Sequence, residues 1–372
     1  MFLRVKEKSM SLLLICMIAL IGILANPVDV SASQPEKIKV KVFIGAMFEI
    51  GANTGDRAGE FQHWYERYFM KTEPVAIAGT ENPFYCNEDG VAGAILGMGK
   101  VRSSSSMQAI LSDPRYDFSE TYFIISGVAG TPPSQGTIAS VFWGTYLVDY
   151  DLGHRWSPNE NTPGAPTFMP RKGYESVRLI QLNPTLVEWS MKLTQDTTLL
   201  DSDSAKSYRR LYPNAAAQRS PFVGLGTHIA GDCFFHGPGL SNEAQYMTEL
   251  YKVDPYVITE MEGVAVAYII RKNVGVDRVM ALRTAVNFDQ GNPNETTLGH
   301  LDPAPGQTPG GFEVGVKNVE LVGSRMVDYI LKNWDIWNVN SLYDPHSYSN
   351  TDRASTSDGH AEQNYCKNDA FS

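Results

Sequence analysis

The hydrophobic pattern of the chain alternates between strand-like and helix-like segments. Residues 39–47 (KVKVFIGAM) alternate polar and apolar positions and then turn wholly apolar, which is typical of a strand entering a buried sheet. Similar patterns predict strands at residues 121–126, 138–148, 223–229 and 279–285. Helical periodicity between them predicts helices at residues 60–70, 104–111, 185–193, 242–251, 257–272 and 318–334. Strands that alternate with helices predict an α/β fold with a mixed or largely parallel sheet.

The segment 259–265 (TEMEGVA) places two acidic residues at the start of an otherwise apolar helix pattern. A carboxylate held there must find hydrogen-bond donors, and the two hydroxyls of a sugar diol would supply them. Glu260 and Glu262 are two positions apart, so on a helix they point to different sides and at most one faces a ligand. The alternative is that both carboxylates only favour the positive N-terminal end of the helix.

The first 32 residues are typical of a secretory signal peptide. A basic start (residues 1–8) is followed by an apolar stretch (residues 11–25) and by small residues that end at Ala32 and Ser33. Cleavage near Ala32 would export the protein to the periplasm, the cell surface or the medium. An uncleaved membrane anchor is the competing interpretation.

The rest of the chain has the composition of a large globular domain. It holds no later stretch near the roughly 20 apolar residues that a membrane span requires, so we expect this part to be soluble. We predict one domain over residues 35–345 and a polar tail over residues 346–372, with a long insertion at about 151–220, where Pro, Asn, Ser and Arg are frequent. A net charge of -10 argues against nucleic acid or an anionic membrane as a partner.

Three cysteines remain after removal of the signal peptide. Cys86 and Cys366 lie in polar, loop-like sequence, and in an exported protein we predict that they form a disulfide and leave Cys233 free. No cysteine pair shows metal-ligand spacing, and the seven histidines form no HxH or HxxxH cluster. We therefore predict no metal and no cofactor.

Glycine-rich turns follow or precede several of the predicted elements, at residues 44–47, 51–57, 97–101, 126–130 and 231–237. Open α/β sheets bind ligands at the carboxyl ends of their strands, which is where such turns lie. One turn alone is weak evidence, but the order and wording of all five resemble the nucleoside phosphorylase and nucleosidase superfamily. Within it, IGAMFEIGANTGDRAGEFQHWYE and SGVAGTPPSQGTIASVFWGTYLVDYDLGHRW resemble the purine nucleoside permease family over essentially the whole chain after the signal peptide.

The resemblance implies a nucleoside phosphorylase-like three-layer α/β/α fold, with a mixed, partly barrel-like central sheet and a long insertion. It also implies a nucleoside site. Met261 and Glu262 would hold the ribose, and Met47 would line its pocket. Phe234 would stack on the purine, with Phe235 beside it.

The same resemblance assigns Gly127 and Gly130 to a loop that holds phosphate or the attacking water. Arg57 is a candidate phosphate ligand, since a guanidinium in a glycine-rich turn suits an oxyanion; an ordinary surface arginine is the alternative. The glutamate that activates water in nucleosidases falls near Ile50, with Glu49 adjacent. Its absence from that position weakens the expectation of catalysis.

Asn287 stands where nucleosidases place the aspartate that protonates the departing purine. An amide can hydrogen-bond N7 or a 6-oxo group but is a poor general acid. Asp289 could supply the proton instead, or could be a loop carboxylate without a catalytic role.

Two functions follow from the resemblance. The first is cleavage of the N-glycosidic bond of purine nucleosides, with phosphate or water as the acceptor. The second is purine nucleoside uptake, in which the exported protein would act beside a separate membrane transporter. The sequence leaves open which purine nucleoside is preferred and whether the chain forms a homo-oligomer.

Overall fold

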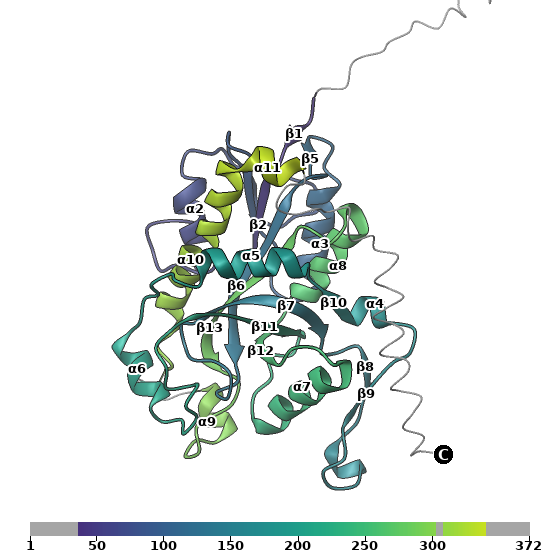
Figure 1. Ribbon diagram of the computed structural model, residues 1–372, viewed down its shortest axis with the longest axis vertical. Coiled ribbons are helices and arrows are strands. Elements are labelled where there is room, and N and C mark those ends of the chain that lie inside the picture. The colour runs from purple at the N-terminus through teal and green to yellow at the C-terminus, as the bar shows by residue number, and fades with distance from the viewer. Residues whose placement is uncertain (1–35, 303–307, 340–372) are drawn as a thin grey trace, which may run out of the picture. The chain divides into compact units, whose positions relative to one another are not determined.

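The computed structural model describes residues 36–302 and 308–339 (Figure 1). The chain divides into two compact units, and all the described residues except residue 36 belong to the second, which spans residues 37–372. The predicted signal peptide, the polar tail and Cys366 lie outside the described residues. The Cys86–Cys366 disulfide and the domain limits therefore stay predictions.

Within the described residues, a mixed sheet of nine strands forms the centre of the fold. Its strands are β2 (Val42–Ala46), β3 (Phe84–Cys86), β4 (Val91–Ile95), β6 (Tyr122–Thr131), β7 (Val141–Asp149), β10 (Leu179–Gln181), β11 (Val223–Ala230), β12 (Tyr256–Glu260) and β13 (Val279–Phe288). Two further pairs are β1 (Ile38–Lys39) with β5 (Tyr116–Asp117), and β8 (Gly153–Arg155) with β9 (Phe168–Pro170). Every strand predicted from the apolar runs is present.

Five of the strands close into a barrel. β13 pairs with both β6 and β7, β11 joins β7 to β12, and β12 returns to β6 through the pair Thr259 and Gly130. β2, β4 and β3 extend the sheet beyond β6. This arrangement confirms the predicted mixed, partly barrel-like sheet.

Helices cover both faces of the sheet, which confirms the predicted α/β/α layers (Figure 1). One layer contains α2 (Gln62–Tyr68), α5 (Pro184–Thr194), α10 (Phe312–Lys332) and α11 (Trp334–Val339), and the other contains α3 (Lys100–Leu111) and α8 (Gly263–Val274). The remaining helices are η1 (Pro158–Glu160), α4 (Glu175–Arg178), α6 (Asp203–Arg209), α7 (Pro238–Tyr251) and α9 (Thr297–Leu301). No helix in residues 36–302 and 308–339 is long and apolar enough to cross a membrane.

Helix α10 shows how the sequence pattern produces this packing. Its apolar residues recur every three or four positions and are buried against the sheet at Val316, Val319, Val322, Met326, Val327 and Ile330. Gly323 permits close contact with α2 in the same layer and with β13 of the sheet, because a Cβ atom there would lie 2.5 Å from the ring of Trp64 and 2.8 Å from the side chain of Leu282. The helix predicted at residues 318–334 is thus present and begins six residues earlier.

The helix predicted over residues 257–272 is wrong in its first part. Residues 256–260 form strand β12, and the helix begins only at Gly263. Val257, Ile258 and Thr259 are β-branched, which favours an extended backbone in a buried sheet. The inference that Glu260 and Glu262 lie on opposite sides of one helix is wrong for the same reason.

Residues 151–220, predicted as an insertion, contribute to the central layers. β10 pairs with β7, and α5 packs on the sheet after Asn183, whose side chain accepts hydrogen bonds from the backbone N–H groups of Thr185 and Leu186. The β8–β9 hairpin is different, since it forms its own two-stranded sheet and projects from the central layers (Figure 1).

Candidate functional site

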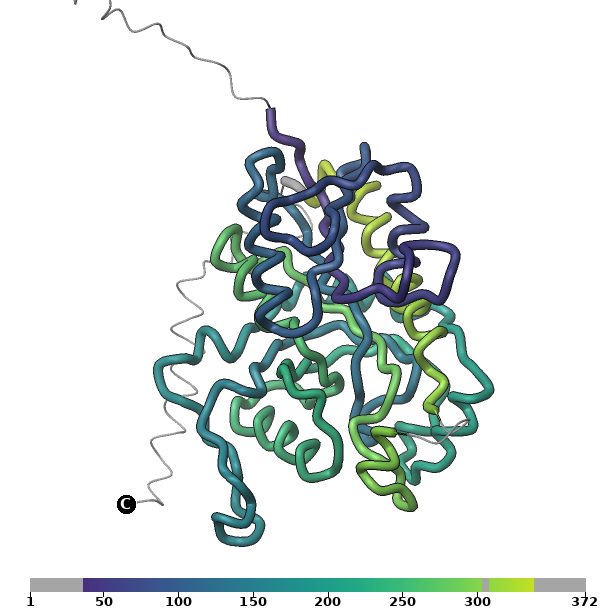
Figure 2. The backbone as a smooth tube through the Cα atoms, turned by 180° about the vertical axis from the view of Figure 1, so that it is seen from behind, coloured from purple at the N-terminus to yellow at the C-terminus, as the bar shows by residue number. Residues whose placement is uncertain are grey.

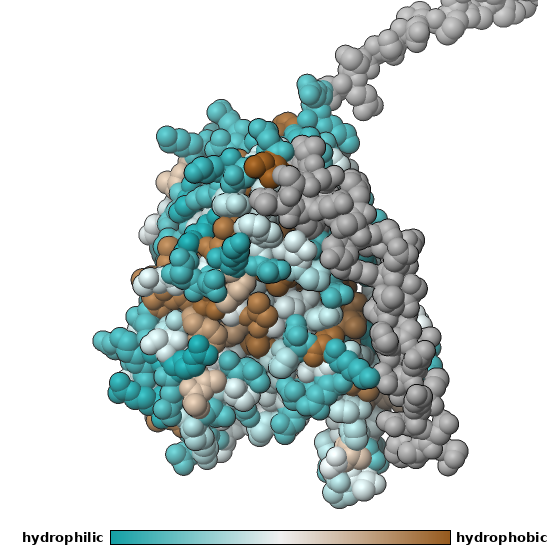
Figure 3. Space-filling model, in the orientation of Figure 1, coloured by the Kyte–Doolittle hydropathy of each residue, from teal (hydrophilic) through white to brown (hydrophobic). Residues whose placement is uncertain are grey.

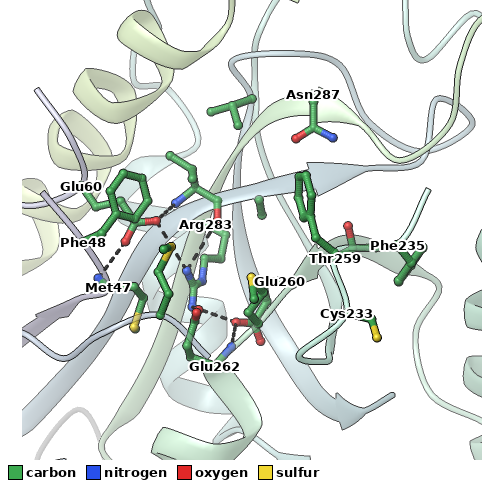
Figure 4. A pocket seen from close by; sticks show the side chains of 16 residues that line it. Met47, Phe48, Glu60, Cys233, Phe235, Thr259, Glu260, Glu262, Arg283 and Asn287 are labelled. Carbon is green, nitrogen blue, oxygen red and sulfur yellow. Dashed lines mark hydrogen bonds and ion pairs between the residues drawn. The ribbon is translucent and has the colours of Figure 1, made fainter. Parts of the chain in front are cut away.

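A pocket of about 380 Å³ lies at the carboxyl ends of the central strands (Figure 4). Its walls come from the ends of β6, β12 and β13 and from the segments that follow β2, β4 and β11. The lining residues are Met47, Phe48, Glu60, Met98, Val128, Ala129, Cys233, Phe234, Phe235, Thr259, Glu260, Met261, Glu262, Arg283, Val286 and Asn287. Six of the residues proposed from sequence for the sugar and the base are therefore brought together: Met47, Phe234, Phe235, Met261, Glu262 and Asn287.

A second hollow, of about 500 Å³, lies beside α5 and is lined by residues of β7, β10 and α5. The face that α5 crosses shows apolar residues scattered among polar ones (Figure 3). The charged residues of this hollow, Glu188, Lys192 and Asp254, are exposed to solvent. The smaller pocket is the better candidate, because its charged groups are buried and converge on one point.

The buried carboxyl groups of the pocket converge on Arg283. It lies in β13, and its side chain is 2% exposed. Its Nη2 donates hydrogen bonds to Glu260 Oε2 at 2.7 Å and to Glu262 Oε2 at 3.0 Å, and its Nη1 lies 3.9 Å from Glu60 Oε1. Figure 4 shows Arg283 with Glu60 on one side and the other two glutamates on the other. A buried cation needs such partners, because an unpaired charge is strongly disfavoured there.

Arg283 was not among the residues proposed from sequence, and neither was Glu60, the next buried group of the pocket. It lies just before α2, where Oε2 accepts a hydrogen bond from the Met47 N–H at 2.7 Å and Oε1 accepts one from the Val128 N–H at 2.6 Å. Burial raises the pKa of Glu60 to about 7, although Arg283 acts in the opposite direction. The carboxyl group can therefore take up or release a proton near neutral pH.

Glu49, the residue beside the expected position of the nucleosidase glutamate, has a structural role. Its carboxylate accepts hydrogen bonds from the backbone N–H groups of Gly59, Phe61 and Gln62, at the start of α2. These bonds close the loop that separates β2 from α2. The pocket carboxylate in this part of the chain is Glu60, eleven residues further along.

Glu260 and Glu262 both line the pocket but differ in their remaining capacity for hydrogen bonds. Glu260 accepts bonds from the backbone N–H groups of Glu262 and Gly263 as well as from Arg283, and so holds the start of α8. Glu262 accepts one bond at Oε1, from the Gly99 N–H at 2.8 Å, and one at Oε2, from Arg283. Burial raises the pKa of Glu262, and Arg283 opposes that change. A carboxylate oxygen accepts more than one hydrogen bond, so Glu262 can still accept from a ligand at both oxygens.

Gly127 and Gly130 lie in strand β6, and the pocket is lined by the two residues between them, Val128 and Ala129. A Cβ atom at Gly127 would lie 2.3 Å from Arg283 Nη1 and 2.5 Å from Glu60 Oε1. One at Gly130 would lie 2.7 Å from the Thr259 hydroxyl oxygen. These glycines leave room for the buried charges and for the barrel closure, and they lie in a strand, whereas the resemblance implied a loop that holds phosphate or the attacking water.

The aromatic residues after β11 play different parts. Phe234 lines the pocket and is 59% exposed, so its ring is available to a ligand. Phe235 is buried and stacks on Tyr150, with ring centroids 4.8 Å apart. Asn287 lies across the pocket from the glutamates, and its Nδ2 donates a hydrogen bond to the Phe288 carbonyl at 2.7 Å.

Two of the residues proposed from sequence lie outside the pocket lining. Arg57 is exposed, its Nε lies 3.7 Å from Glu313 Oε1, and its guanidinium packs over the ring of Phe312 at the start of α10. Figure 2 shows the purple loop between β2 and α2 lying beside the yellow-green helix α10. Asp289 is buried, and its Oδ2 accepts hydrogen bonds from the hydroxyls of Tyr256 at 2.7 Å and Ser241 at 3.2 Å. Burial raises the pKa of Asp289 to about 6.

Residues 36–302 and 308–339 contain no group of three or more His, Cys, Asp or Glu side chains placed to hold a metal ion. Cys233 lines the pocket and is exposed, and Cys86 ends β3 and is half-buried.

Solved structures with a similar fold include a hydrolase and a nucleosidase. Futalosine hydrolase of Helicobacter pylori aligns with a TM-score of 0.50 and 17% identity, over 78% of this chain and 98% of that one. The 5'-methylthioadenosine/S-adenosylhomocysteine nucleosidase of the same organism, in complex with butyl-thio-DADMe-Immucillin-A, aligns with a TM-score of 0.50 and 16% identity, over 78% of this chain and all of that one. At these identities the likeness shows the fold alone.

Two fungal proteins are similar in sequence. A Schizosaccharomyces pombe protein described as a probable purine nucleoside permease is 26% identical over 325 residues, which cover 80% of this chain and 91% of that protein. A Candida albicans purine nucleoside permease is 24% identical over 332 residues, covering 83% of this chain and 80% of that protein. Residues 39–341 match the sequence pattern of the purine nucleoside permease family, and the chain therefore belongs to that family.

Proposed function

We propose that this protein binds purine nucleosides and cleaves their N-glycosidic bond, with water as the acceptor. The observation that carries the proposal is the group formed by Glu60, Arg283 and Glu262, buried beside an apolar pocket of nucleoside size. Buried carboxyl groups with shifted pKa values at the carboxyl ends of strands are typical of catalytic sites.

Glu262 is the group that binds the sugar. Both of its oxygens hold one protein hydrogen bond and can accept another, which suits the two hydroxyls of a ribose. Glu260 is less suited, because its oxygens already hold the start of α8 and Arg283. As the bond to the base breaks, positive charge develops on the ribose, and the adjacent carboxylates stabilise it.

The purine lies between Phe234 and Asn287. The exposed ring of Phe234 stacks on the base, and the larger surface of a purine gains more from this contact than that of a pyrimidine. The amide of Asn287 hydrogen-bonds N7 or a 6-oxo group.

Glu60 activates the water. A general base is most effective when its pKa lies near the working pH, and the pKa of Glu60, about 7, meets this condition at neutral pH. The water oxygen bonds to C1' of the ribose while its proton passes to Glu60. The bond from C1' to the purine breaks, and the base leaves with the electron pair and takes a proton from solvent.

The charges of the pocket favour water over phosphate. Among the described residues that line it, Arg283 is the cation, and it faces Glu60, Glu260 and Glu262. A phosphate dianion would meet three carboxyl groups against one guanidinium, whose Nη2 already donates to Glu260 and Glu262. Arg57, the other candidate for phosphate, is outside the lining.

Product analysis tests the proposal. The purified protein is incubated with adenosine, inosine and guanosine, with and without phosphate, and the products are separated by chromatography. We expect free purine and ribose in amounts that do not depend on phosphate. Ribose 1-phosphate would contradict the choice of water, and intact nucleosides would contradict cleavage.

Purine nucleoside uptake is the second candidate, and the description of the family and the names of the two fungal relatives favour it. In this role the protein, exported by its N-terminal segment, would deliver nucleosides or their products to a separate membrane transporter. Uptake of labelled adenosine by cells that express the protein or its Glu262→Gln variant tests the idea. Uptake that is equal with and without the protein would contradict it.

A further inference from the structure

The turn between β4 and α3 joins three parts of the pocket. The Gly97 N–H donates a hydrogen bond to the Met47 carbonyl at 3.1 Å, and the Gly99 N–H donates one to Glu262 at 2.8 Å. The next N–H, of Lys100, donates to Asp232 Oδ1 at 2.7 Å. Consecutive backbone groups of one turn thus hold the carboxylate that faces the sugar and the residue that begins the segment leading to Phe234.

The side chain of Lys100 ties this turn to the end of β7. Its Nζ donates hydrogen bonds to Asp149 Oδ1 and Asp151 Oδ2, each at 2.7 Å, and its side chain is only 16% exposed. Asp151 Oδ2 also accepts the Asp232 N–H at 2.9 Å. Lys100 therefore contacts Asp232 directly through its backbone and indirectly through Asp151.

The turn can take this shape only with glycine. Gly97 and Gly99 have φ angles of +97° and +83°, a region that other residues rarely adopt. A Cβ atom at Gly99 would also lie 3.1 Å from Asp232 Oδ1. The backbone is thus shaped to present adjacent N–H groups to two carboxylates.

We propose that Lys100 is a positioning residue that couples the sugar-binding carboxylate Glu262 to the base-stacking ring of Phe234. The inference rests on the proposed nucleoside site and goes beyond it. Without the ammonium group, Asp149 and Asp151 would face each other unneutralised, and the turn would lose the contact that fixes it between β7 and the Asp232 segment. The turn that holds Glu262 and the Asp232 segment that leads to Phe234 would then lose the same support.

A double-mutant cycle on nucleoside binding tests the coupling. Lys100→Met, Glu262→Gln and the double variant are titrated with inosine by calorimetry, in a Glu60→Gln background that slows turnover. We expect Lys100→Met to weaken binding roughly tenfold, Glu262→Gln to weaken it roughly 30-fold, and the double change to weaken it little more than Glu262→Gln alone, because both changes act on the same carboxylate. Independent, multiplicative effects would overturn the inference.

Matched variants separate positioning from general stability. Arg102→Met removes a cation from the same helix whose partner, Glu81, is on the surface, and it should leave inosine binding unchanged. Lys100→Arg keeps the charge and should retain most of the affinity. If Lys100→Met does not fold, Asp151→Asn loosens the same contact while Lys100 keeps Asp149, and it enters the cycle instead.

The two proposals fail in different ways. Coupled effects on binding without cleavage by the unmodified protein would support the role of Lys100 and overturn the proposed hydrolysis. Normal cleavage with multiplicative effects would overturn only the role of Lys100. Absence of inosine binding by the unmodified protein would overturn both.

Discussion

Glu60 Oε1 lies 3.9 Å from Arg283 Nη1, near enough for attraction but beyond a direct hydrogen bond. The closer contacts of Arg283 go to Glu260 and Glu262. Burial raises the pKa of Glu60 to about 7, because it outweighs the opposing effect of Arg283 and the negative charge of Glu262 acts in the same direction as burial. The catalytic proposal depends on this raised pKa.

The stability of the fold should depend on the protonation of Glu60. Its pKa in the folded state, about 7, lies above the ordinary value of 4.5, so between these pH values the folded state holds a proton that the unfolded state releases. Stability from this group is therefore full below about pH 4.5 and is lost as pH rises to about 7. At about 1.4 kcal/mol per unit of pKa shift, the free energy of unfolding falls by on the order of 3 kcal/mol over this range.

Glu60→Gln removes this titration, since the amide is neutral at every pH. The free energies of unfolding of the variant and the unmodified protein are measured by denaturant titration. The value for the variant minus that for the unmodified protein should rise by on the order of 3 kcal/mol between pH 4.5 and 8. Glu66→Gln, at an exposed position on α2, is the control and should show no comparable trend. A constant difference for Glu60→Gln across this range would show that Glu60 is ionised throughout.

Substitutions of the two glutamates at the β12–α8 junction should have different effects. Glu262→Gln should weaken nucleoside binding by about 2 kcal/mol, because an acceptor of the ribose hydroxyls is replaced by an amide. Glu260→Gln should mainly lower the melting temperature, because its carboxylate holds the backbone at the start of α8. Calorimetric titration and thermal unfolding of both variants decide this, and the same balance of effects in each would contradict the assignment.

Base selectivity should follow from Phe234 and Asn287. Inosine and adenosine should bind and uridine should not, and Phe234→Ala should weaken purine binding by about 1 kcal/mol as the stacking is lost. Asn287→Asp should move the preference toward 6-amino purines, since a protonated carboxyl donates to N7 without a 6-oxo partner. Titration calorimetry with the three nucleosides tests both statements. Uridine binding as tight as that of inosine, or no effect of Asn287→Asp, would place these residues outside the base site.

Much of the fold was predictable, because the strands are short apolar runs and the glycine-rich turns follow in a recognisable order. The start of α8 was not, since Val257–Thr259 fit both a buried strand and an apolar helix by periodicity alone. Only the pairing of β12 with β6 and β11 decides between them.

The site was partly predictable. Motif order located Glu262, Phe234 and Asn287, but it assigned no role to Glu60, although Glu60 lies within the segment IGAMFEIGANTGDRAGEFQHWYE, and none to Arg283. A clue to Arg283 was present, since an arginine inside the apolar run VMALRTAV must have buried partners. Which carboxylates those are depends on strands that lie far apart in the sequence, so Glu60 could be recognised only in three dimensions.

The pH dependence of kcat/KM for inosine cleavage tests the central claim, that Glu60 acts as the base toward water, most directly. We expect kcat/KM of the unmodified protein to fall as pH drops below about 7, because Glu60 becomes protonated. Glu60→Gln should reduce kcat by roughly 100-fold to 10,000-fold and remove this pH dependence. Activity near that of the unmodified protein in Glu60→Gln, with the same pH profile, would contradict the account.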